Sequence, residues 1–510
     1  MNKTRKSLET SISSKFPFRR KYFLRLATGA LLLAWAFLYL PNLGTTPRWY
    51  GDETITLSCG QDLVHGVFAN RATWNTYMNP QFCYQPGYVF LVGLASTISH
   101  QNIAWPRFLN ALCALGIAWV ALRVLGRRFG ITAGLSIGLL FLSYEQSVIH
   151  FRWVYAHNAV ALGLFICFCF QTIPMRRRRS WGAGAGLAIA AASHPLALQG
   201  GLAAFLNRWN RPRTWLPLFA PPLGVGLLSL SPIFFWKPDW FIHDIFELKE
   251  FYGSSSQDIG TGWQWPIIFW RFFTHDWFHI LALASALFCL FSRFRPIALA
   301  SILIAALLTR NRQNLPVFYY QAVVILPLLA AGIGYAIVRL SKVLPWQKHI
   351  SRWLAFVLPA LLFCLVLPEV CTSSLISRND PWVVHSINDI KETADWVNQH
   401  TQPEDLVICH WNIGWLLRCQ NADPLMSVAW EGLPTFTYEH GLSKERFRYS
   451  ADIRKAKFFV LTDIDHIWTL AQPNVNAVVN ERNLLGWQPV YKSGNCLVLA
   501  PPISVPDAKR

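Results

Sequence analysis

Apolar stretches close to membrane-spanning length recur along the first 372 residues. Examples are LATGALLLAWAFLYL (26–40), ALCALGIAWVALRVL (111–125), LPLFAPPLGVGLLSLSPIFFW (216–236) and WLAFVLPALLFCLVL (353–367). About 20 apolar residues in a helix cross the hydrocarbon core of a bilayer. Many of the 24 tryptophans stand at the ends of these stretches, where amphipathic rings favour the lipid headgroups. The pattern predicts an all-α polytopic membrane domain.

Composition supports this prediction. Only 14% of the residues are charged and 53% are hydrophobic, whereas soluble domains carry roughly 25% charged residues. The formal net charge of +19 does not indicate nucleic acid. Residues 373–510 hold 13 Lys and Arg against 15 Asp and Glu, and the remaining residues hold 33 against 12. This excess lies in short clusters between apolar stretches, such as MRRRRS (175–180), which is typical of cytoplasmic loops.

The basic clusters fix a topology of 11 crossings with the N-terminus inside. Residues 1–23 are expected to be a cytoplasmic tail, 24–372 the membrane domain, and 373–510 an outer domain. Outer loops are expected at 41–106, which includes a juxtamembrane helix at 87–99, and at 237–276. Residues 131–150 are predicted to be one crossing. Residues 181–207 extend roughly 40 Å as a helix, too little for two full crossings, so we expect two short helices turning at 193–195.

Residues 373–510 predict a small α/β domain. DLVICHW, KFFVLTD and the pair WQPVYKS-GN-CLVLAPP read as strands, and IKETADWVNQH has helical spacing. Metal and phosphate motifs are absent from this sequence, so a lid or acceptor platform is the expected role. Six cysteines are expected outside: Cys59, Cys83, Cys371, Cys409, Cys419 and Cys496. Cys59–Cys83 and Cys409–Cys419 are possible disulfides.

The topology places polar side chains from distant segments at one depth, near the outer face. They are Asp52, Glu53, Glu145, His150, Arg152, Tyr155, His157, His194, Lys237, Asp239, Arg310 and Arg312. Ionisable groups at membrane depth are costly and mark either function or a structural ion pair. A carboxylate facing Arg and His suits attack by a hydroxyl on a phosphate-linked lipid. The carboxylate accepts the hydroxyl proton, and arginine matches the phosphate oxygens.

Four segments resemble the type-C glycosyltransferases of family 39 and their relatives, which include protein O-mannosyltransferases and aminoarabinose lipid A transferases. The segments are WYGDETITL, then QPGYVFLVGL with WPRFLNALCALGIAWVALRVLGRRFG, then HFRWVYAHN, and LPVFYYQAVVILPLLAAGIGYAI. The resemblance covers residues 20–372 and implies the same 11-crossing fold. It also implies that Asp52 is the catalytic carboxylate, Glu53 its companion and Arg152 the arginine partner. The chain departs from the family at Tyr84-Gln85-Pro86, where members often carry His-Pro-Pro, and at His194, where they often carry Lys.

The resulting hypothesis is an inverting glycosyltransferase of the bacterial cell membrane. It would move a sugar from a polyprenyl-phosphate donor to a hydroxyl of a lipid, polysaccharide or protein on the outer side. Substrate contacts are expected from Arg310, Arg312, Lys237, His194, Tyr155 and His157. We expect no cofactor, because the sequence has no G-x-G-x-x-G or P-loop pattern, and no metal-ligand spacing occurs. A transporter of a lipid-linked sugar and a non-enzymatic assembly protein are the alternatives, although the two halves lack the repeats common in transporters.

Overall fold

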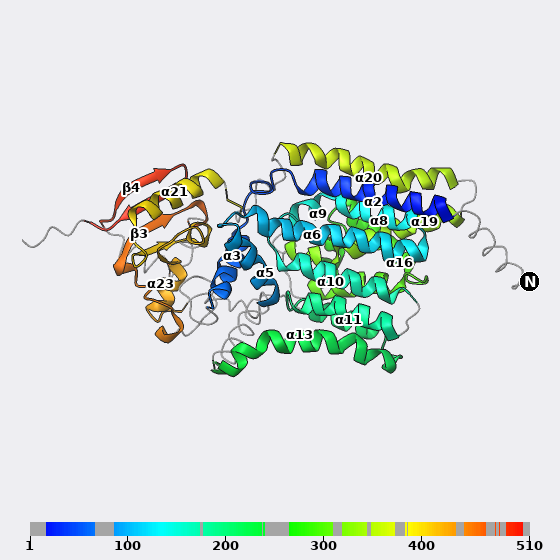
Figure 1. The fold of residues 1–510 in the computed structure, drawn as a ribbon, viewed down its shortest axis with the longest axis horizontal. Coiled ribbons are helices and arrows are strands. Elements are labelled where there is room, and N and C mark those ends of the chain that lie inside the picture. Colours follow the sequence, from blue (N-terminus) through cyan, green and yellow to red (C-terminus); the bar gives the residue numbers. More distant parts are fainter. Residues whose placement is uncertain are drawn as a thin grey trace, which may run out of the picture.

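The computed structural model divides into a helical bundle and a smaller α/β domain, with two helices between them (Figure 1). It describes residues 17–66, 86–173, 177–236, 238–239, 265–309, 319–343, 348–372, 383–384, 386–434, 443–465, 475, 479 and 486–502. Three predicted substrate-binding residues, Lys237, Arg310 and Arg312, lie outside this part of the chain, as does Cys83.

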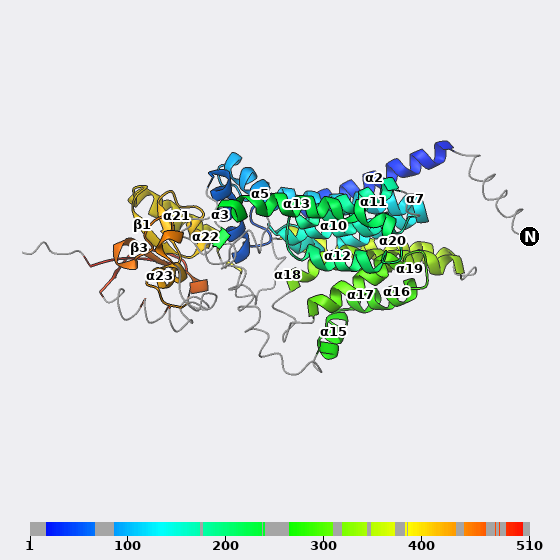
Figure 2. The ribbon, with the colours of Figure 1, turned by 90° about the horizontal axis from the view of Figure 1, so that it is seen from below.

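Most of the long helices run roughly along the long axis of the molecule (Figures 1 and 2), and the bundle as a whole contains the following helices. They are α2 (Pro17–Tyr39), α6 (Ala104–Val120) continued by η2 (Ala121–Leu125) and α7 (Gly126–Phe129), α8 (Ile131–Ser143), α9 (Glu145–His150), α10 (Ala156–Gln171), α11 (Arg177–Ala191), α12 (Ala197–Leu206), η3 (Pro212–Thr214), α13 (Trp215–Trp236), α15 (Trp265–Phe273), α16 (Trp277–Cys289), α17 (Arg295–Thr309), α18 (Tyr319–Ala322), η5 (Val323–Ile325), α19 (Leu326–Val343) and α20 (Lys348–Cys371). Helices α11 and α12 flank residues 193–195, as the sequence predicted.

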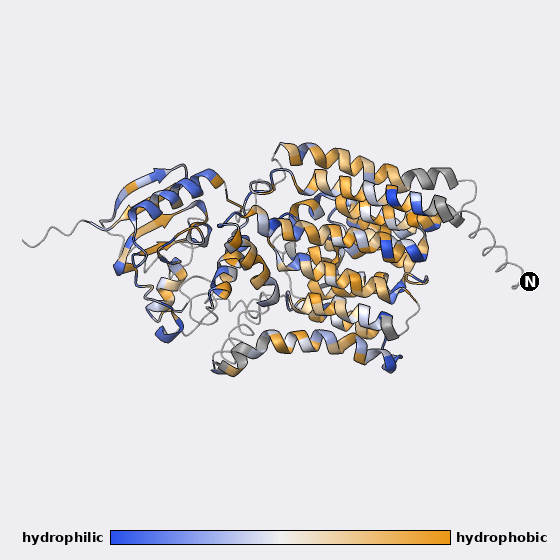
Figure 3. Ribbon diagram, in the orientation of Figure 1, coloured by the Kyte–Doolittle hydropathy of each residue, from blue (hydrophilic) through white to orange (hydrophobic). Residues whose placement is uncertain are grey.

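Apolar residues predominate along the helices of the bundle (Figure 3), and many of them are exposed on its outside. Leu33, Leu228 and Phe291 are 60%, 75% and 97% exposed, which a soluble protein would avoid across so large a surface. Within the described residues, Lys21–Tyr39, Ala104–Phe129 and Val323–Leu340 are long and apolar enough to cross a membrane, and α15 with α16 forms a bent pair that passes the same test together. The chain is therefore a helical membrane protein, and the total of 11 crossings remains a prediction.

Two segments differ from their predicted form. The predicted crossing at 131–150 is interrupted at Tyr144, whose extended backbone (φ −76°, ψ 125°) separates α8 from α9. The expected loop around Asp52 is instead α3 (Gly51–Val64). This helix packs against α5 (Pro86–Ile98), the juxtamembrane helix that the sequence predicted.

Helices α3 and α5 cross at a pair of glycines. A Cβ built on Gly93 would lie 2.1 Å from the carbonyl oxygen of Gly60, and one built on Gly60 would lie 2.5 Å from Gly93 Cα. Only glycine permits so close a backbone approach. The two helices therefore form one rigid pair, which lies between the bundle and the α/β domain (Figures 1 and 2).

The α/β domain contains a mixed five-stranded sheet of order β2-β1-β3-β5-β4. Its strands are β1 (Leu406–Cys409), β2 (Gln420–Ala422), β3 (Ala456–Leu461), β4 (Gln488–Ser493) and β5 (Cys496–Ala500). Its helices include α21 (Ile387–His400), the four-residue α22 (Trp411–Gly414) and α23 (Pro424–Trp430), with the short turns η7 (Lys444–Arg446) and η8 (Ile453–Lys455). Strand β1 is parallel to β2 and β3, and β5 is antiparallel to β3 and β4. The predicted helix and strands are present, and the three-residue β2 was not predicted.

The β4–β5 hairpin turns at Gly494 and Asn495, between the paired residues Ser493 and Cys496. Gly494 has a φ of +52°, and a Cβ there would lie 1.9 Å from a carboxylate oxygen of Asp389. Cys409 and Cys419 are buried free thiols, so the possible disulfide between them is not formed. Each behaves as a small apolar group in the domain core. The other possible disulfide, Cys59–Cys83, cannot be compared because Cys83 lies outside the described residues.

Candidate active site

Asp52 and Glu53 occupy the first turn of α3. Tyr50 precedes the helix in an extended conformation, and its backbone N–H donates to Glu53 Oε2 at 3.0 Å. Negative charge is stabilised in this turn by the free N–H groups and the dipole of the helix. The two carboxylates differ in environment, because Glu53 is fully buried and Asp52 is only half-buried. Of these two residues, Asp52 is therefore the one with a surface open to solvent.

The carboxylate of Glu53 is held by four hydrogen bonds. Arg107 donates from Nε to Oε1 at 2.9 Å and from Nη2 to Oε2 at 2.6 Å. The Val154 backbone N–H donates to Oε1 at 2.8 Å, and Tyr50 supplies the fourth bond. Each oxygen of this carboxylate accepts two hydrogen bonds, so its lone pairs are committed to the surrounding structure. Glu53 therefore joins α3 to α6 and to the segment before α10.

Arg107 is a site residue that the sequence reasoning did not single out. It lies in the first turn of α6, is fully buried, and also donates from Nη1 to the carbonyl oxygens of Leu43 and Pro47 at 3.0 and 2.7 Å. It was visible only as a single charge at the start of an apolar crossing. An arginine there is costly without a partner, and this signal could have nominated it as the partner of Glu53.

Arg152 was predicted to face the carboxylates or the phosphate. Its guanidinium instead donates to backbone carbonyl oxygens: to Leu38 at 2.7 Å, to Thr46 at 2.8 and 3.1 Å, and to Pro41. The ion pair with Glu53 is made by Arg107 rather than Arg152. The carbonyls belong to the end of α2 and to the loop before α3, so Arg152 fixes the path that leads to Asp52. A contact between Arg152 and phosphate remains a prediction.

Aromatic and imidazole rings form a continuous series from the start of α3 into the bundle. Tyr50 lies 5.7 Å from Tyr155 between ring centroids, Tyr155 lies 5.8 Å from His157, and His157 lies 4.6 Å from His194. Three of the predicted substrate-binding residues are thus brought together from two segments about 40 residues apart. His194 lies in the turn between α11 and α12, where its Nδ1 accepts a hydrogen bond from the Leu196 backbone N–H at 3.1 Å.

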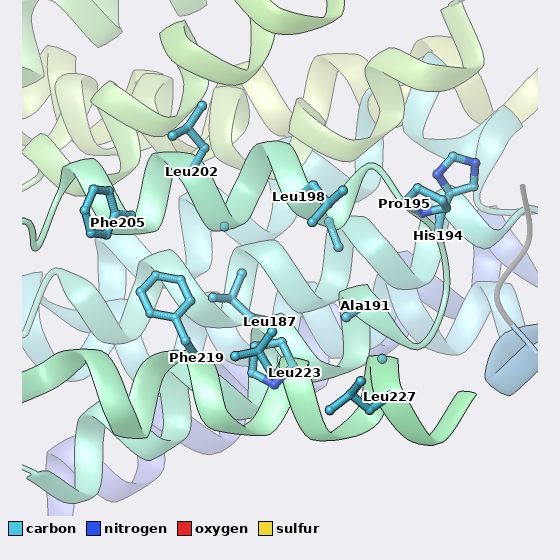
Figure 4. A pocket seen from close by; sticks show the side chains of 14 residues that line it. Leu187, Ala191, His194, Pro195, Leu198, Leu202, Phe205, Phe219, Leu223 and Leu227 are labelled. Atoms are coloured by element: carbon cyan, nitrogen blue, oxygen red, sulfur yellow. The ribbon is translucent and has the colours of Figure 1, made fainter. Parts of the chain in front are cut away.

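An apolar cavity of about 660 Å³ begins at His194 (Figure 4). Its walls come from α11, α12 and α13. Leu198 and Leu202 of α12 and Leu223 and Leu227 of α13 line it, with Phe205 and Phe219 at the end away from His194 (Figure 4). These side chains are aliphatic or aromatic, and those of Leu198, Leu223 and Leu227 are largely exposed. The shape and chemistry suit a hydrocarbon chain that enters from the surrounding lipid.

Among the residues that the structure describes, no group of three or more His, Cys, Asp or Glu is arranged to hold a metal ion. The described part of the site contains one partly exposed carboxylate, two buried arginines that hold the neighbouring segments in place, and a series of rings that leads to an apolar cavity.

Comparison with known proteins gives structural relatives only. No family model and no curated protein match the chain. ArnT from Cupriavidus metallidurans, solved bound to undecaprenyl phosphate, superposes with a TM-score of 0.57 at 14% identity, covering 94% of this chain and 98% of that one. Its apo form gives 0.58 at 15% identity with the same coverage. The Archaeoglobus fulgidus oligosaccharyltransferase in complex with Zn and sulfate gives 0.52 at 12% identity, covering 93% of this chain and 74% of that one. The chain has the membrane fold of the type-C glycosyltransferases.

Proposed function

We propose that the protein is an inverting glycosyltransferase. It takes a sugar from a polyprenyl-phosphate carrier and passes it to an acceptor hydroxyl at the outer face of the bacterial cell membrane. The observation that carries the proposal is the ring series Tyr50–Tyr155–His157–His194, which connects the turn bearing Asp52 to the apolar cavity. A lipid-linked sugar donor needs both ends of this arrangement: the apolar cavity for its isoprenoid chain, and the turn bearing Asp52 for its reacting carbon.

In the proposed reaction, the acceptor oxygen attacks the anomeric carbon as the bond from that carbon to the phosphate oxygen breaks. Asp52 accepts the hydroxyl proton as general base. Polyprenyl phosphate leaves without needing a proton, and one displacement inverts the configuration of the anomeric carbon. Glu53 and Arg107 hold the turn that carries Asp52, and Arg152 holds the loop before it. Such fixed geometry is worth several kcal/mol of the activation barrier.

The donor is proposed to place its isoprenoid chain in the apolar cavity and its phosphate near His194. One related structure was solved with undecaprenyl phosphate, which supports a carrier of this class. Tyr155 and His157 would contact the sugar or the phosphate, since both belong to the same ring series. Lys237, Arg310 and Arg312 remain proposed phosphate contacts on the basis of the sequence alone.

The test is transfer of label from a radiolabelled polyprenyl-phosphate sugar to a membrane extract by the purified protein. General bases contribute roughly 10²- to 10⁴-fold in rate, so Asp52→Asn should lower transfer at least about 100-fold. Asp62→Asn is the matched control, because Asp62 lies ten residues further along the same helix and its contact with Arg448 is long, at 3.9 Å. Equal transfer by wild type and Asp52→Asn would refute the assignment of the base, and absence of transfer by wild type from the donors tested would refute the proposed activity with those donors.

A further inference from the structure

The α/β domain contacts the turn that carries Asp52. The indole N–H of Trp411 donates to the carbonyl oxygen of Gly51 at 2.9 Å. The neighbouring Asn412 accepts, at Oδ1, a hydrogen bond from the Thr54 hydroxyl at 2.7 Å. Trp411 and Asn412 both lie in α22 and are 3% and 1% exposed. These bonds join residues about 360 positions apart in the sequence and are shielded from water.

Further contacts hold the same segment. The Val384 backbone N–H donates to the Trp49 carbonyl oxygen at 2.9 Å, next to a β-bridge between Tyr50 and Val383. The ring of Trp49 lies edge-on to that of Trp415, with centroids 5.4 Å apart. The α/β domain therefore contacts residues 49, 50, 51 and 54, and not only one point of this segment.

The position of the Trp411 bond has a direct consequence for Asp52. The Gly51 carbonyl and the Asp52 amide nitrogen belong to the same planar peptide unit. A donor that fixes the Gly51 oxygen therefore fixes the orientation of the Asp52 backbone. The Thr54 hydroxyl also lies 2.8 Å from the Gly51 oxygen. Since a hydroxyl has one proton, it donates to Gly51 or to Asn412 at a given moment.

The residues on either side of Asp52 are thus held by contacts from two different domains. On one side, Arg107 of the membrane domain holds the adjacent residue Glu53. On the other, α22 of the α/β domain holds Gly51 and Thr54. Neither Arg107 nor α22 lines the apolar cavity proposed for the isoprenoid chain, which lies among α11, α12 and α13.

We propose that Trp411 and Asn412 are positioning residues for Asp52, which makes the α/β domain part of the catalytic unit. This inference rests on the proposed function, because it assumes that Asp52 is the base. Loss of either bond leaves the donor cavity intact and misplaces the carboxylate. The turnover rate then falls while donor binding is retained.

The first variant is Trp411→Phe, which keeps an aromatic ring and removes the N–H. A misplacement of about 1 Å in an active site can cost about 100-fold in rate, so kcat should fall about 10- to 100-fold. The Kd for polyprenyl phosphate should stay within about threefold of the wild-type value. Trp430→Phe is the matched control, because Trp430 packs on Phe447 inside the same domain and should keep the wild-type kcat.

The second test uses two variants of Thr54, the residue of α3 whose hydroxyl bonds to Asn412. Thr54→Val keeps the side-chain shape and removes the hydroxyl, whereas Thr54→Ser keeps the hydroxyl. The inference requires a lower kcat for Thr54→Val and recovery by Thr54→Ser at an equal melting temperature. A purely structural role would lower the melting temperature of Thr54→Val and leave kcat of the folded fraction unchanged.

The outcomes separate this inference from the proposed function. If Asp52→Asn is inactive while Trp411→Phe and Thr54→Val turn over within twofold of wild type, the positioning role is refuted and the base assignment stands. If Asp52→Asn is fully active, the base assignment itself fails. If Trp411→Phe does not fold, the Thr54 pair gives the result by itself.

Discussion

Two adjacent carboxylates, Asp52 and Glu53, have different surroundings, and we propose different roles for them on that ground. Glu53 is fully buried and accepts four hydrogen bonds, including the bidentate pair from Arg107. Asp52, one residue earlier, is half-buried. A buried, fully bonded carboxylate stabilises geometry, whereas an accessible one can exchange a proton with a substrate. The proposed roles therefore rest on the environment of each carboxylate and not on its residue type.

The Glu53–Arg107 pair predicts strong coupling in a double-mutant cycle. Glu53→Leu or Arg107→Leu alone leaves an unpaired buried charge, so each should lower the free energy of unfolding by about 3–5 kcal/mol. The double variant removes both charges and should cost clearly less than the sum. Unfolding by denaturant in detergent measures all four proteins. Strictly additive effects would contradict the direct ion pair.

His410 predicts a pH-dependent stability. It is fully buried, its Nδ1 accepts a hydrogen bond from the Asn412 N–H at 3.2 Å, and burial lowers its pKa to about 3 from 6.5. The unfolded chain therefore binds more protons between these values. The contribution is fully present above pH 6.5 and is lost as the pH falls toward 3.

From pH 7 to pH 4 the loss at this one group amounts to about 3 kcal/mol. The His410→Asn variant retains a side-chain acceptor for the Asn412 N–H and has no titrating group. Its stability should consequently fall less than that of wild type over the same range. Denaturant unfolding of the full-length protein at both pH values measures the difference, and parallel losses in both proteins would count against a buried neutral histidine.

At the scale of elements, we expect the close contact between α3 and α5 to be required for activity. A methyl group at Gly93 would lie 2.1 Å from the backbone of Gly60, so Gly93→Ala must push the helices apart. We expect transfer activity to fall at least about 10-fold, because α3 carries Asp52. The control is Gly29→Ala in α2, where the added Cβ meets nothing within 4 Å. Activity assays and melting temperatures of both variants provide the comparison, and wild-type activity in Gly93→Ala would show that the helix spacing is not critical.

Long apolar elements were predictable, and the elements around the site were less so. The helices at 104–129, 156–171 and 215–236 follow predicted crossings, because composition alone determines a membrane-length apolar segment. Helix α3 was missed, since its sequence GDETITLSCGQDLV has weak apolar periodicity. The interruption at Tyr144 was also missed, because it depends on tertiary contacts such as the stacking of Tyr144 on Phe278.

At the scale of the whole molecule, the sequence could place candidate residues at one depth but could not pair them. The topology placed His157 and His194 at the same depth, and only the structure shows that their rings lie 4.6 Å apart. The pairing of Glu53 with Arg107 and the contact of Trp411 with Gly51 depend on how segments far apart in the chain fold back. Such contacts carry no local sequence signal.

The molecule combines three parts in one proposed site. The bundle supplies an apolar cavity that ends at His194, the α3–α5 pair presents Asp52, and the α/β domain fixes the turn that carries it (Figures 1 and 4). Donor binding and proton acceptance are thus assigned to different parts. A substitution of Asp52 should therefore slow the chemical step and leave the affinity for the donor unchanged.

Single-turnover transfer is the measurement that tests this account most directly. The protein is first loaded with a labelled polyprenyl-phosphate sugar that wild type is able to use, and membrane extract is then added. The account predicts that Asp52→Asn binds the donor with a Kd within about threefold of wild type and transfers its sugar at least about 100-fold more slowly. Transfer by Asp52→Asn at the wild-type rate would contradict it.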